Sequence, residues 1–403
     1  MVDLCTCKRI FNYRIFKQFL SFILIFTLIS SFDLLFNASF SQERLAVTHG
    51  PYLIDPAENG ITVVWFTNKR CVSRVEYTTD PKNVYNSTVS IHQGLVDAYT
   101  TEHTIRITGL EAGKTYSYRV VSKEFVTFKP YQVVYGDSIV SAVYTFKTLD
   151  TKKTDFSFGI VNDIHQRAGH LDSLLQRLSW ENIDIFFYNG DLVDYYEDES
   201  LIFSGFLDVS VQRFAKNIPF VYIRGNHDTR GNFARNLMQY FPHSSGRFYY
   251  SFNHGLVHFI ILDSGEDKRD DTPVYAGLVD FDAYRQEQAV WLKEEVKSES
   301  FKNSLYRIVI FHIPPFISIY GSQYLTKEWV PILNTAGIDL VINAHTHRYG
   351  RTQPTEGRNS FINLILGNSE IAQVDVSRRQ LSITVLRKDG STVDVFSVPP
   401  QKR

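Results

Sequence analysis

The sequence predicts an antiparallel β-sandwich followed by an α/β domain, and three observations carry that prediction. Residues 44–148 contain short strand patterns with a turn signal about every ten residues, which is typical of an antiparallel sandwich of roughly 100 residues. Beyond residue 155, apolar strands alternate with helical stretches, which indicates an α/β domain. Aromatic residues make up 14% of the chain, and such residues pack well on the half-buried surface of a pleated sheet.

The strands of the sandwich are predicted from runs that alternate or that are β-branched and aromatic. Turn signals such as Glu58–Gly60 and Glu111–Gly113 separate these runs. The polar stretch Leu149–Asp155 shows no periodicity, so we interpret it as the linker between the two domains. The predicted strands of the sandwich are Gly60–Phe66, Ser73–Tyr77, His103–Ile107 and Thr115–Val121.

The α/β domain is predicted from apolar runs separated by helical patterns. Helices are expected near His170–Ser179 and over Tyr284–Lys297, and the tail Phe361–Val398 is expected to add strands of a second sheet. The strands expected between them are Phe156–Val161, Ile183–Tyr188, Pro219–Ile223, Leu256–Leu262, Tyr306–Phe311 and Ile338–Ile342.

Composition and charge exclude several classes of protein. The chain has 403 residues, enough for two or three domains that each bury a core. With 44% apolar and 21% charged residues it is neither a disordered chain nor a disulfide-stapled mini-protein. Its 42 basic and 43 acidic residues give a net charge of −1, so it lacks the basic excess of a nucleic-acid binder.

The first 41 residues are predicted to be a secretory signal peptide. A basic start precedes the apolar run Phe19–Ile29, and small and polar residues lead to a predicted cut between Ser41 and Gln42. The alternative is an uncleaved membrane anchor. The apolar stretch stops at Asp33, short of the eighteen or so residues that a span normally needs, which favours the signal peptide.

Cysteine usage fits a chain without disulfides. Of the three cysteines, Cys5 and Cys7 lie in the predicted signal peptide, and only Cys71 stays in the mature chain. An exported protein without disulfides depends for its stability on core burial, on bound metal, or on both.

Polar residues of the types that ligate metals follow five of the predicted strands. Because ligands bind at the carboxyl ends of strands in open α/β sheets, these residues are expected to meet at one edge. The five segments are Asn162–His165, Asn189–Asp191, Arg224–Asp228, His312 and Asn343–His347.

Two pairs within these segments have the spacing of paired ligands. Asp163 and His165 are two residues apart, and so are His345 and His347, so each pair projects to one side of an extended backbone. Together with a bridging Asp191 they could hold two divalent ions. Imidazole and oxygen ligands without thiolate suit Zn, Fe or Mn and argue against a structural zinc site. Two such ions could activate a shared water and clamp a phosphoryl group.

The ordered series DxH, GD, GNHD, H and HxH resembles the calcineurin-like metallophosphoesterase superfamily. Motifs of the first domain resemble the N-terminal fibronectin-type domain of purple acid phosphatases, and Ala344–Arg351 is similar to the last motif of those enzymes. The first-domain motifs are His49–Tyr52, Ile61–Trp65, His103–Leu110, Thr115–Tyr118 and Tyr144–Thr148.

The resemblance implies a fold and a set of roles. It implies a fibronectin type III-like sandwich over residues 44–148 and a four-layer α/β/β/α metallophosphoesterase domain over 155–403. It also implies that His227 acts as an acid or electrostatic stabiliser at the leaving or phosphoryl oxygen, oriented by Asp228. The implied ligands are Asp163, His165 and His347 for one metal, Asn226, His312 and His345 for the other, and Asp191 as the bridge.

The sequence also departs from the purple enzymes. Their tyrosine ligand comes three residues after the bridging aspartate, where this chain has Asp194, and Tyr195 follows one residue later. Their first motif lacks a histidine at the position of His165, so we expect a histidine-type first site without iron–tyrosinate colour. Asp194 and Tyr195 could line the pocket or cap a helix. Arg230 could clamp phosphate or lie solvated at the surface, and Ser264–Phe281 is expected to form a rim loop.

These observations predict an exported phosphoric ester hydrolase, periplasmic or secreted. Attack of a metal-bridging hydroxide on small phosphate monoesters is the expected reaction. The partner is a small-molecule substrate, with no nucleic-acid binding beyond a possible substrate and no stable membrane association after signal cleavage. A phosphodiesterase or nucleotide-directed hydrolase of the same fold is the first alternative. A non-catalytic binding or adhesion protein on this scaffold is the second.

Overall fold

The structure is a computed structural model that describes residues 43–82 and 85–401. From Leu45 onward the chain forms one compact unit. The predicted signal peptide, its cleavage point, Cys5 and Cys7 lie outside the described residues. Within those residues, no helix combines the length and the apolar character that a membrane span requires. Cys71 is buried, without a disulfide partner in the described chain.

The N-terminal region is rich in antiparallel strands, as predicted. The 19-residue strand β2 organises it, because the first half of β2 pairs with β6 and the second half with β7. Alternate residues of β2, including Ile61, Val63 and Trp65, point into the core of this region. The strands are β1 (Val47–Ile54), β2 (Gly60–Thr78), β3 (Asn86–Thr88), β4 (Ile91–His92), β5 (Leu95–Val96), β6 (Ala98–Thr108), β7 (Thr115–Lys129), β8 (Gln132–Val140) and β9 (Tyr144–Lys147).

The C-terminal region contains two sheets that pack face to face. In the first, the parallel strands β10, β11 and β12 continue into the antiparallel strands β19, β20 and β21. In the second, β14, β15, β16 and β18 are parallel, with β13 and β17 at the edges. Their bounds are β10 (Phe156–Val161), β11 (Ile183–Asn189), β12 (Phe220–Ile223), β13 (Tyr250–His254), β14 (Val257–Ile261), β15 (Tyr306–Ile310), β16 (Leu340–Asn343), β17 (Gly350–Thr352), β18 (Ile362–Ile365), β19 (Glu370–Val376), β20 (Leu381–Arg387) and β21 (Thr392–Val398).

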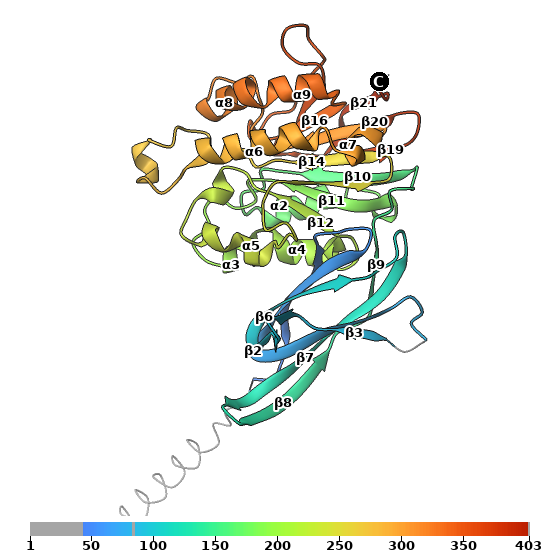
Figure 1. Ribbon diagram of the computed structural model, residues 1–403, viewed down its shortest axis with the longest axis vertical. Coiled ribbons are helices and arrows are strands. Elements are labelled where there is room, and N and C mark those ends of the chain that lie inside the picture. The colour runs from blue at the N-terminus through green and yellow to red at the C-terminus, as the bar shows by residue number, and fades with distance from the viewer. Residues whose placement is uncertain (1–42, 83–84, 402–403) are drawn as a thin grey trace, which may run out of the picture. The chain divides into compact units, whose positions relative to one another are not determined.

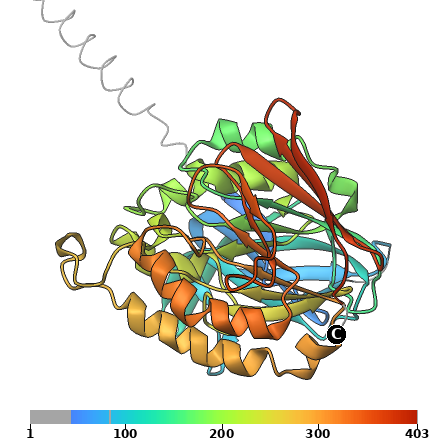
Figure 2. The same cartoon turned by 90° about the horizontal axis from the view of Figure 1, so that it is seen from above.

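Helices cover the outer faces of both sheets, which confirms the predicted four-layer α/β/β/α architecture (Figures 1 and 2). Strand β11 shows how the sequence builds the layers: Ile185 and Phe187 enter the core between the sheets, whereas Phe186 and Tyr188 face the helical layer. The helices are α2 (Ala168–Leu175), α3 (Ser200–Ile202), α4 (Asp208–Ser210), α5 (Leu237–Tyr240), α6 (Phe281–Glu295), α7 (Glu299–Asn303), α8 (Tyr320–Glu328) and α9 (Val330–Ala336).

The β-rich region is joined to the first sheet of the C-terminal region by strand pairing. Ile54 of β1 pairs in parallel with Phe220 of β12, so a single hydrogen-bonded sheet runs through both regions. Two buried hydroxyls reinforce the junction: Tyr52 donates to the carbonyl of Tyr240 at 2.6 Å, and Tyr118 donates to that of Lys216 at 2.7 Å. The two regions therefore share a packed junction in place of a loose linker.

Glu102 of β6 carries an unfavourable charge beside this junction. Burial and the neighbouring charge of Glu199 raise the pKa of Glu102 to about 7 from an ordinary value of 4.5. Between pH 4.5 and pH 7 the carboxyl of Glu102 is ionised in the unfolded chain but still protonated in the folded chain. The free energy of unfolding therefore falls as pH rises through this range, and it stops falling once the pH exceeds the folded pKa of about 7.

Glu102→Gln is therefore expected to stabilise the protein at pH 8 and to have little effect at pH 4. We expect the melting temperature to rise by about 1–2 °C at pH 8. Thermal unfolding at the two pH values measures this difference. Glu111→Gln, at a carboxylate of the same region with 70% of its side chain exposed, serves as the matched control. An equal shift at both pH values would contradict a charge effect.

Candidate metal centre

All the predicted metal ligands lie at the carboxyl ends of strands, where the edges of the two sheets meet. Asp163 and His165 follow β10, Asp191 follows β11, and His312 follows β15. Asn226 follows β12, and His345 and His347 follow β16. The loops are tied together by their backbones: the amide of His165 donates to the carbonyl of Asp191 at 3.1 Å, and that of Ala344 to the carbonyl of His312 at 2.9 Å.

The backbone of this centre is unusual, because five of the predicted ligands adopt left-handed conformations. Their φ angles range from 49° to 71°, a region of backbone conformation that residues other than glycine rarely adopt. Such conformations persist only where the surrounding fold imposes them, and they gather at functional sites. The five residues are Asp163, His165, Asp191, His345 and His347.

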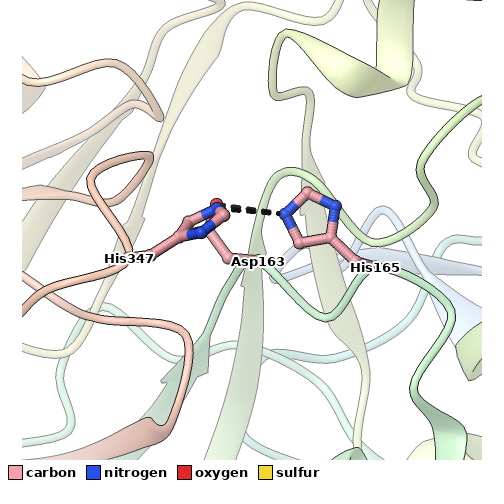
Figure 3. A group of neighbouring side chains, drawn as sticks. All are labelled: Asp163, His165 and His347. Carbon is pink, nitrogen blue, oxygen red and sulfur yellow. Dashed lines mark hydrogen bonds and ion pairs between the residues drawn. The ribbon is translucent and has the colours of Figure 1, made fainter.

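Asp163, His165 and His347 form the first cluster (Figure 3). Nε2 of His347 lies 3.3 Å from Oδ1 of Asp163, and Nε2 of His165 lies 3.8 Å from the same oxygen. The two imidazole Nε2 atoms are 3.2 Å apart. A carboxylate oxygen and two ring nitrogens therefore converge on one point, as the ligands of a cation do.

Asp191, His312, His345 and Asn226 form the second cluster. Nε2 of His312 lies 3.0 Å from Oδ2 of Asp191, and the amide of Asn226 lies 2.9 Å from Nδ1 of His345. His312 donates from Nδ1 to the carbonyl of Asn189 at 2.7 Å, which turns Nε2 toward the carboxylates. Asp163 belongs to both clusters, since its Oδ1 is also 3.8 Å from Nε2 of His312.

One buried oxygen shows that this donor set fits a cation. Oδ2 of Asp163 accepts from the side chain of Asn162 at 2.7 Å and from the amide of His345 at 3.1 Å. Oδ1 is buried and has no hydrogen-bond donor, although histidines from three loops surround it. A buried carboxylate oxygen without a partner is costly, and a metal ion at this position would satisfy it.

The pKa values of the histidines in the second cluster show that the neighbouring carboxylates attract positive charge. Burial alone would lower the pKa of His312, but the charges of Asp191 and Asp163 outweigh it and raise the pKa to about 10. Burial and the neighbouring His312 lower the pKa of His345 to about 4, so its ring is neutral, as a metal ligand must be. The carboxylates therefore hold a proton on His312, which a bound cation would displace, beside the neutral ring of His345.

Two glycines allow the loops to approach closely. A Cβ atom on Gly225 would lie 2.3 Å from Oδ1 of Asp191, and one on Gly190 would lie 2.6 Å from Nδ1 of His312. The glycines of the GD and GNHD motifs are thus needed so that Asp191 and His312 can meet.

The predicted contact between Asp228 and His227 is wrong. The carboxylate of Asp228 is fully buried and accepts from the backbone amides of Gly225 at 2.7 Å and Asp191 at 2.8 Å. Nδ1 of His227 instead donates to the backbone carbonyl of Asp194 at 2.9 Å. The amides of Gly225, Asp191 and Leu192, which belong to two loops, all donate to this carboxylate, and Asp228 accepts them from within the 3₁₀ turn His227–Thr229.

Two neighbours of the centre have partners that the sequence alone did not identify. Oδ1 of Asp194 lies 2.7 Å from Nδ1 of His165, so this carboxylate orients the imidazole toward Asp163. Arg230 is not a solvated surface residue: it forms a two-pronged ion pair with Glu266, and its Nη1 lies 3.1 Å from Nε2 of His227. The i to i+3 spacing of His227 and Arg230 in a helical turn was the available signal for the second contact.

Comparisons with known proteins agree with this geometry. The profile of the calcineurin-like phosphoesterase family matches residues 156–349. Purple acid phosphatase 18 of Arabidopsis thaliana is 25% identical over 340 residues, which cover 77% of this chain and 68% of that protein. Probable inactive purple acid phosphatase 24 of the same plant is 25% identical over 269 residues, 58% of this chain but only 42% of the relative.

Solved structures share the fold. The purple acid phosphatase PPD1 from yellow lupin (Lupinus luteus) superposes with a TM-score of 0.66 at 17% identity, covering 87% of this chain and 74% of that one. PhoD gives 0.60 at 12% identity, covering 87% of this chain and 92% of that one. Strand order, clustered ligands and sequence relatives converge: residues 156–349 of this chain are a calcineurin-like phosphoesterase domain, and purple acid phosphatases are its homologues.

Proposed function

We propose that this chain is an exported phosphatase that hydrolyses small phosphate monoesters with two transition-metal ions bound. The observation that carries the proposal is Oδ1 of Asp163, a buried oxygen without a donor that faces three imidazoles. Such a site is costly when empty and useful when it holds cations. The homologous purple acid phosphatases support phosphoester hydrolysis as the chemistry.

Each cluster would hold one ion. Asp163, His165 and His347 would form the first ligand set and Asn226, His312 and His345 the second, and Asp191, which lies in the second cluster, would bridge the two ions. The bound ions would lower the pKa of a shared water and neutralise charge on the phosphoryl oxygens. Since the donors are imidazole, carboxylate and amide, Fe, Zn and Mn all suit the centre.

His227 and Arg230 would line the phosphate site beside the two bound ions. The hydrogen bond to the carbonyl of Asp194 fixes the ring of His227, so that its Nε2 faces Arg230 and the open side of the centre. From that position His227 could contact the leaving oxygen or a phosphoryl oxygen. Asp194 would act only by positioning His165.

The remaining features of the proposal come from the sequence. The signal peptide over residues 1–41 supports export. The β-rich region over 44–148 would be a fibronectin type III-like domain, and residues 155–403 would form the metallophosphoesterase domain. We expect the phosphate ester to be the main partner of the mature protein.

Two Arabidopsis relatives, purple acid phosphatases 24 and 27, are described as probably inactive. A non-catalytic role for this chain is disfavoured because every predicted ligand reaches one of the two clusters. A diesterase role shares the same centre. The choice between ester classes therefore depends on substrates and not on ligands.

Turnover of p-nitrophenyl phosphate and of its bis ester tests the proposal. We expect the monoester to be cleaved at least about tenfold faster, and the purified protein to carry about two metal ions per chain. Faster cleavage of the bis ester would replace the monoesterase by a diesterase. Metal-loaded protein that cleaves neither ester would refute hydrolysis.

A further inference from the structure

A cavity adjoins the candidate metal centre. It has a volume of about 670 Å³ and lies between the segment after β11, the turn that follows His227 and the rim loop. Residues of all three segments line it, and those that matter below are Tyr195, Arg230, Arg235, Val274 and Leu278. The sequence predicted the rim loop but not that the loop would enclose a cavity.

The cavity shares a wall with the centre. The ring of Tyr195, which lines the cavity, lies 5.8 Å from the ring of His227. Arg230, a second lining residue, approaches Nε2 of His227 to 3.1 Å. The ring of His227 also packs against the metal-ligand candidate His165, with ring centroids 4.9 Å apart. His227 therefore contacts both the lining of the cavity and the first cluster.

Three apolar or aromatic side chains on the rim of the cavity are exposed, although they contribute nothing to a hydrophobic core of the described residues. Val274 is 71% exposed, Leu278 is 69% exposed and Tyr195 is 53% exposed. Single exposed apolar residues are common, but three around one cavity beside a reactive centre indicate a binding surface. Neither Val274 nor Leu278 belongs to a hydrophobic core cluster of the described chain.

The charges within the cavity favour an occupant without positive charge. Arg230 is neutralised by Glu266, and Lys268 is paired with Asp267 at 2.7 Å. Arg235 has no acidic partner among the described residues, and its Nη1 donates to the carbonyl of Gly231 at 3.5 Å. A cationic alcohol would therefore be repelled, whereas a neutral apolar group would meet no electrostatic cost.

We propose that this cavity binds the leaving group of the substrate, and that the preferred substrates are phosphate monoesters of apolar, aromatic alcohols. This inference rests on the proposed phosphatase function. A phosphoryl group at the metal clusters, with its ester oxygen toward His227, places the organic part of the ester against Tyr195, Val274 and Leu278. Apolar contact of this kind, made equally in the ground state and in the transition state, lowers KM and leaves kcat unchanged.

Two esters with leaving groups of nearly equal acidity test the inference: phenyl phosphate and 4-butylphenyl phosphate. We expect the wild-type protein to prefer the butyl ester by about tenfold or more in kcat/KM, chiefly through KM. The double variant Val274→Ser, Leu278→Ser should lose most of that preference, because the substitutions raise KM for the butyl ester far more than for the smaller phenyl ester, while kcat for both stays near that of the wild type. Its fold should be intact, because both side chains are largely exposed.

Val395→Ser is the matched control, since Val395 is 64% exposed on β21 and lies outside the cavity. This variant should keep the preference of the wild type. Equal turnover of the two esters by the wild type, or a preference that survives in the double variant, would overturn the inference but leave the phosphatase function standing. Failure of the metal-loaded wild type to cleave either ester would overturn both.

Discussion

Asp191→Asn is expected to abolish phosphoester hydrolysis and to release metal from the protein. Asp191 is 1% exposed, and its Oδ2 lies 3.0 Å from Nε2 of His312. Its Oδ1 accepts from the amide of His227 at 2.8 Å, so the residue ties the second cluster to the loop that carries His227. Loss of its charge should lower kcat/KM by about 10³-fold or more, equivalent to about 4 kcal/mol of transition-state stabilisation.

Metal content and initial rates of monoester hydrolysis should fall together in this variant. Asp184→Asn is the matched control, because Asp184 also binds a histidine, His254, at 2.7 Å but lies outside the centre. That variant should keep its metal and its activity. Full activity of Asp191→Asn would remove Asp191 from the bridging position and would end the two-ion proposal in its present form.

Asp228→Ala is expected to destabilise the fold more than a surface mutation does. The carboxylate of Asp228 is fully buried and accepts from the amides of Gly225, Asp191 and Leu192, so the substitution would leave three donors without their acceptor. An orphaned buried donor costs about 1–3 kcal/mol, so we expect a loss of about 3–5 kcal/mol in the free energy of unfolding.

Denaturant unfolding of the metal-free protein measures this loss. Asp228→Asn keeps one acceptor oxygen, so its stability should lie between those of the wild type and Asp228→Ala. If Asp228 only holds the loops, the Asn variant at low temperature and saturating metal should keep the pH profile of the wild type. Unchanged stability with a displaced pH profile would contradict this and would assign Asp228 to proton transfer.

The sequence could predict the location of the centre because parallel strands impose it. Each of the polar segments follows a strand pattern, and the carboxyl ends of parallel strands meet at one edge. Strands β10, β11 and β16 accordingly deliver Asp163, Asp191 and His345 to neighbouring loops. The resemblance to metallophosphoesterases then implied the two ligand sets, and the structure clusters the carboxylate and histidine members of each set.

Contacts set by loop conformation could not be predicted in the same way. Asp194 and Asp228 are both acidic neighbours of the motifs, yet one orients His165 and the other caps backbone amides. Their roles depend on left-handed turns that the residue types give no reason to expect. The pairing of Ile54 with Phe220 joins segments far apart in the chain, a register that local patterns do not encode.

Short helices were missed for a different reason. Helix α9 spans only Val330–Ala336 and has a proline in its first turn, so its apolar period completes barely two turns. Its buried residues Ile332 and Leu333 nevertheless belong to the outer core of the second sheet. A pattern this brief is recognisable only once the sheet beneath it is known.

The left-handed ligands have a consequence for the life of the protein in its host. Each such conformation costs about 1 kcal/mol or more, so five of them approach the whole net stability of an ordinary domain. Ions that bind only the folded chain offset this deficit by mass action. The fraction of newly made chains that fold would then depend on the supply of transition metal. In a host short of that metal, more of these chains would stay unfolded and be degraded by proteases.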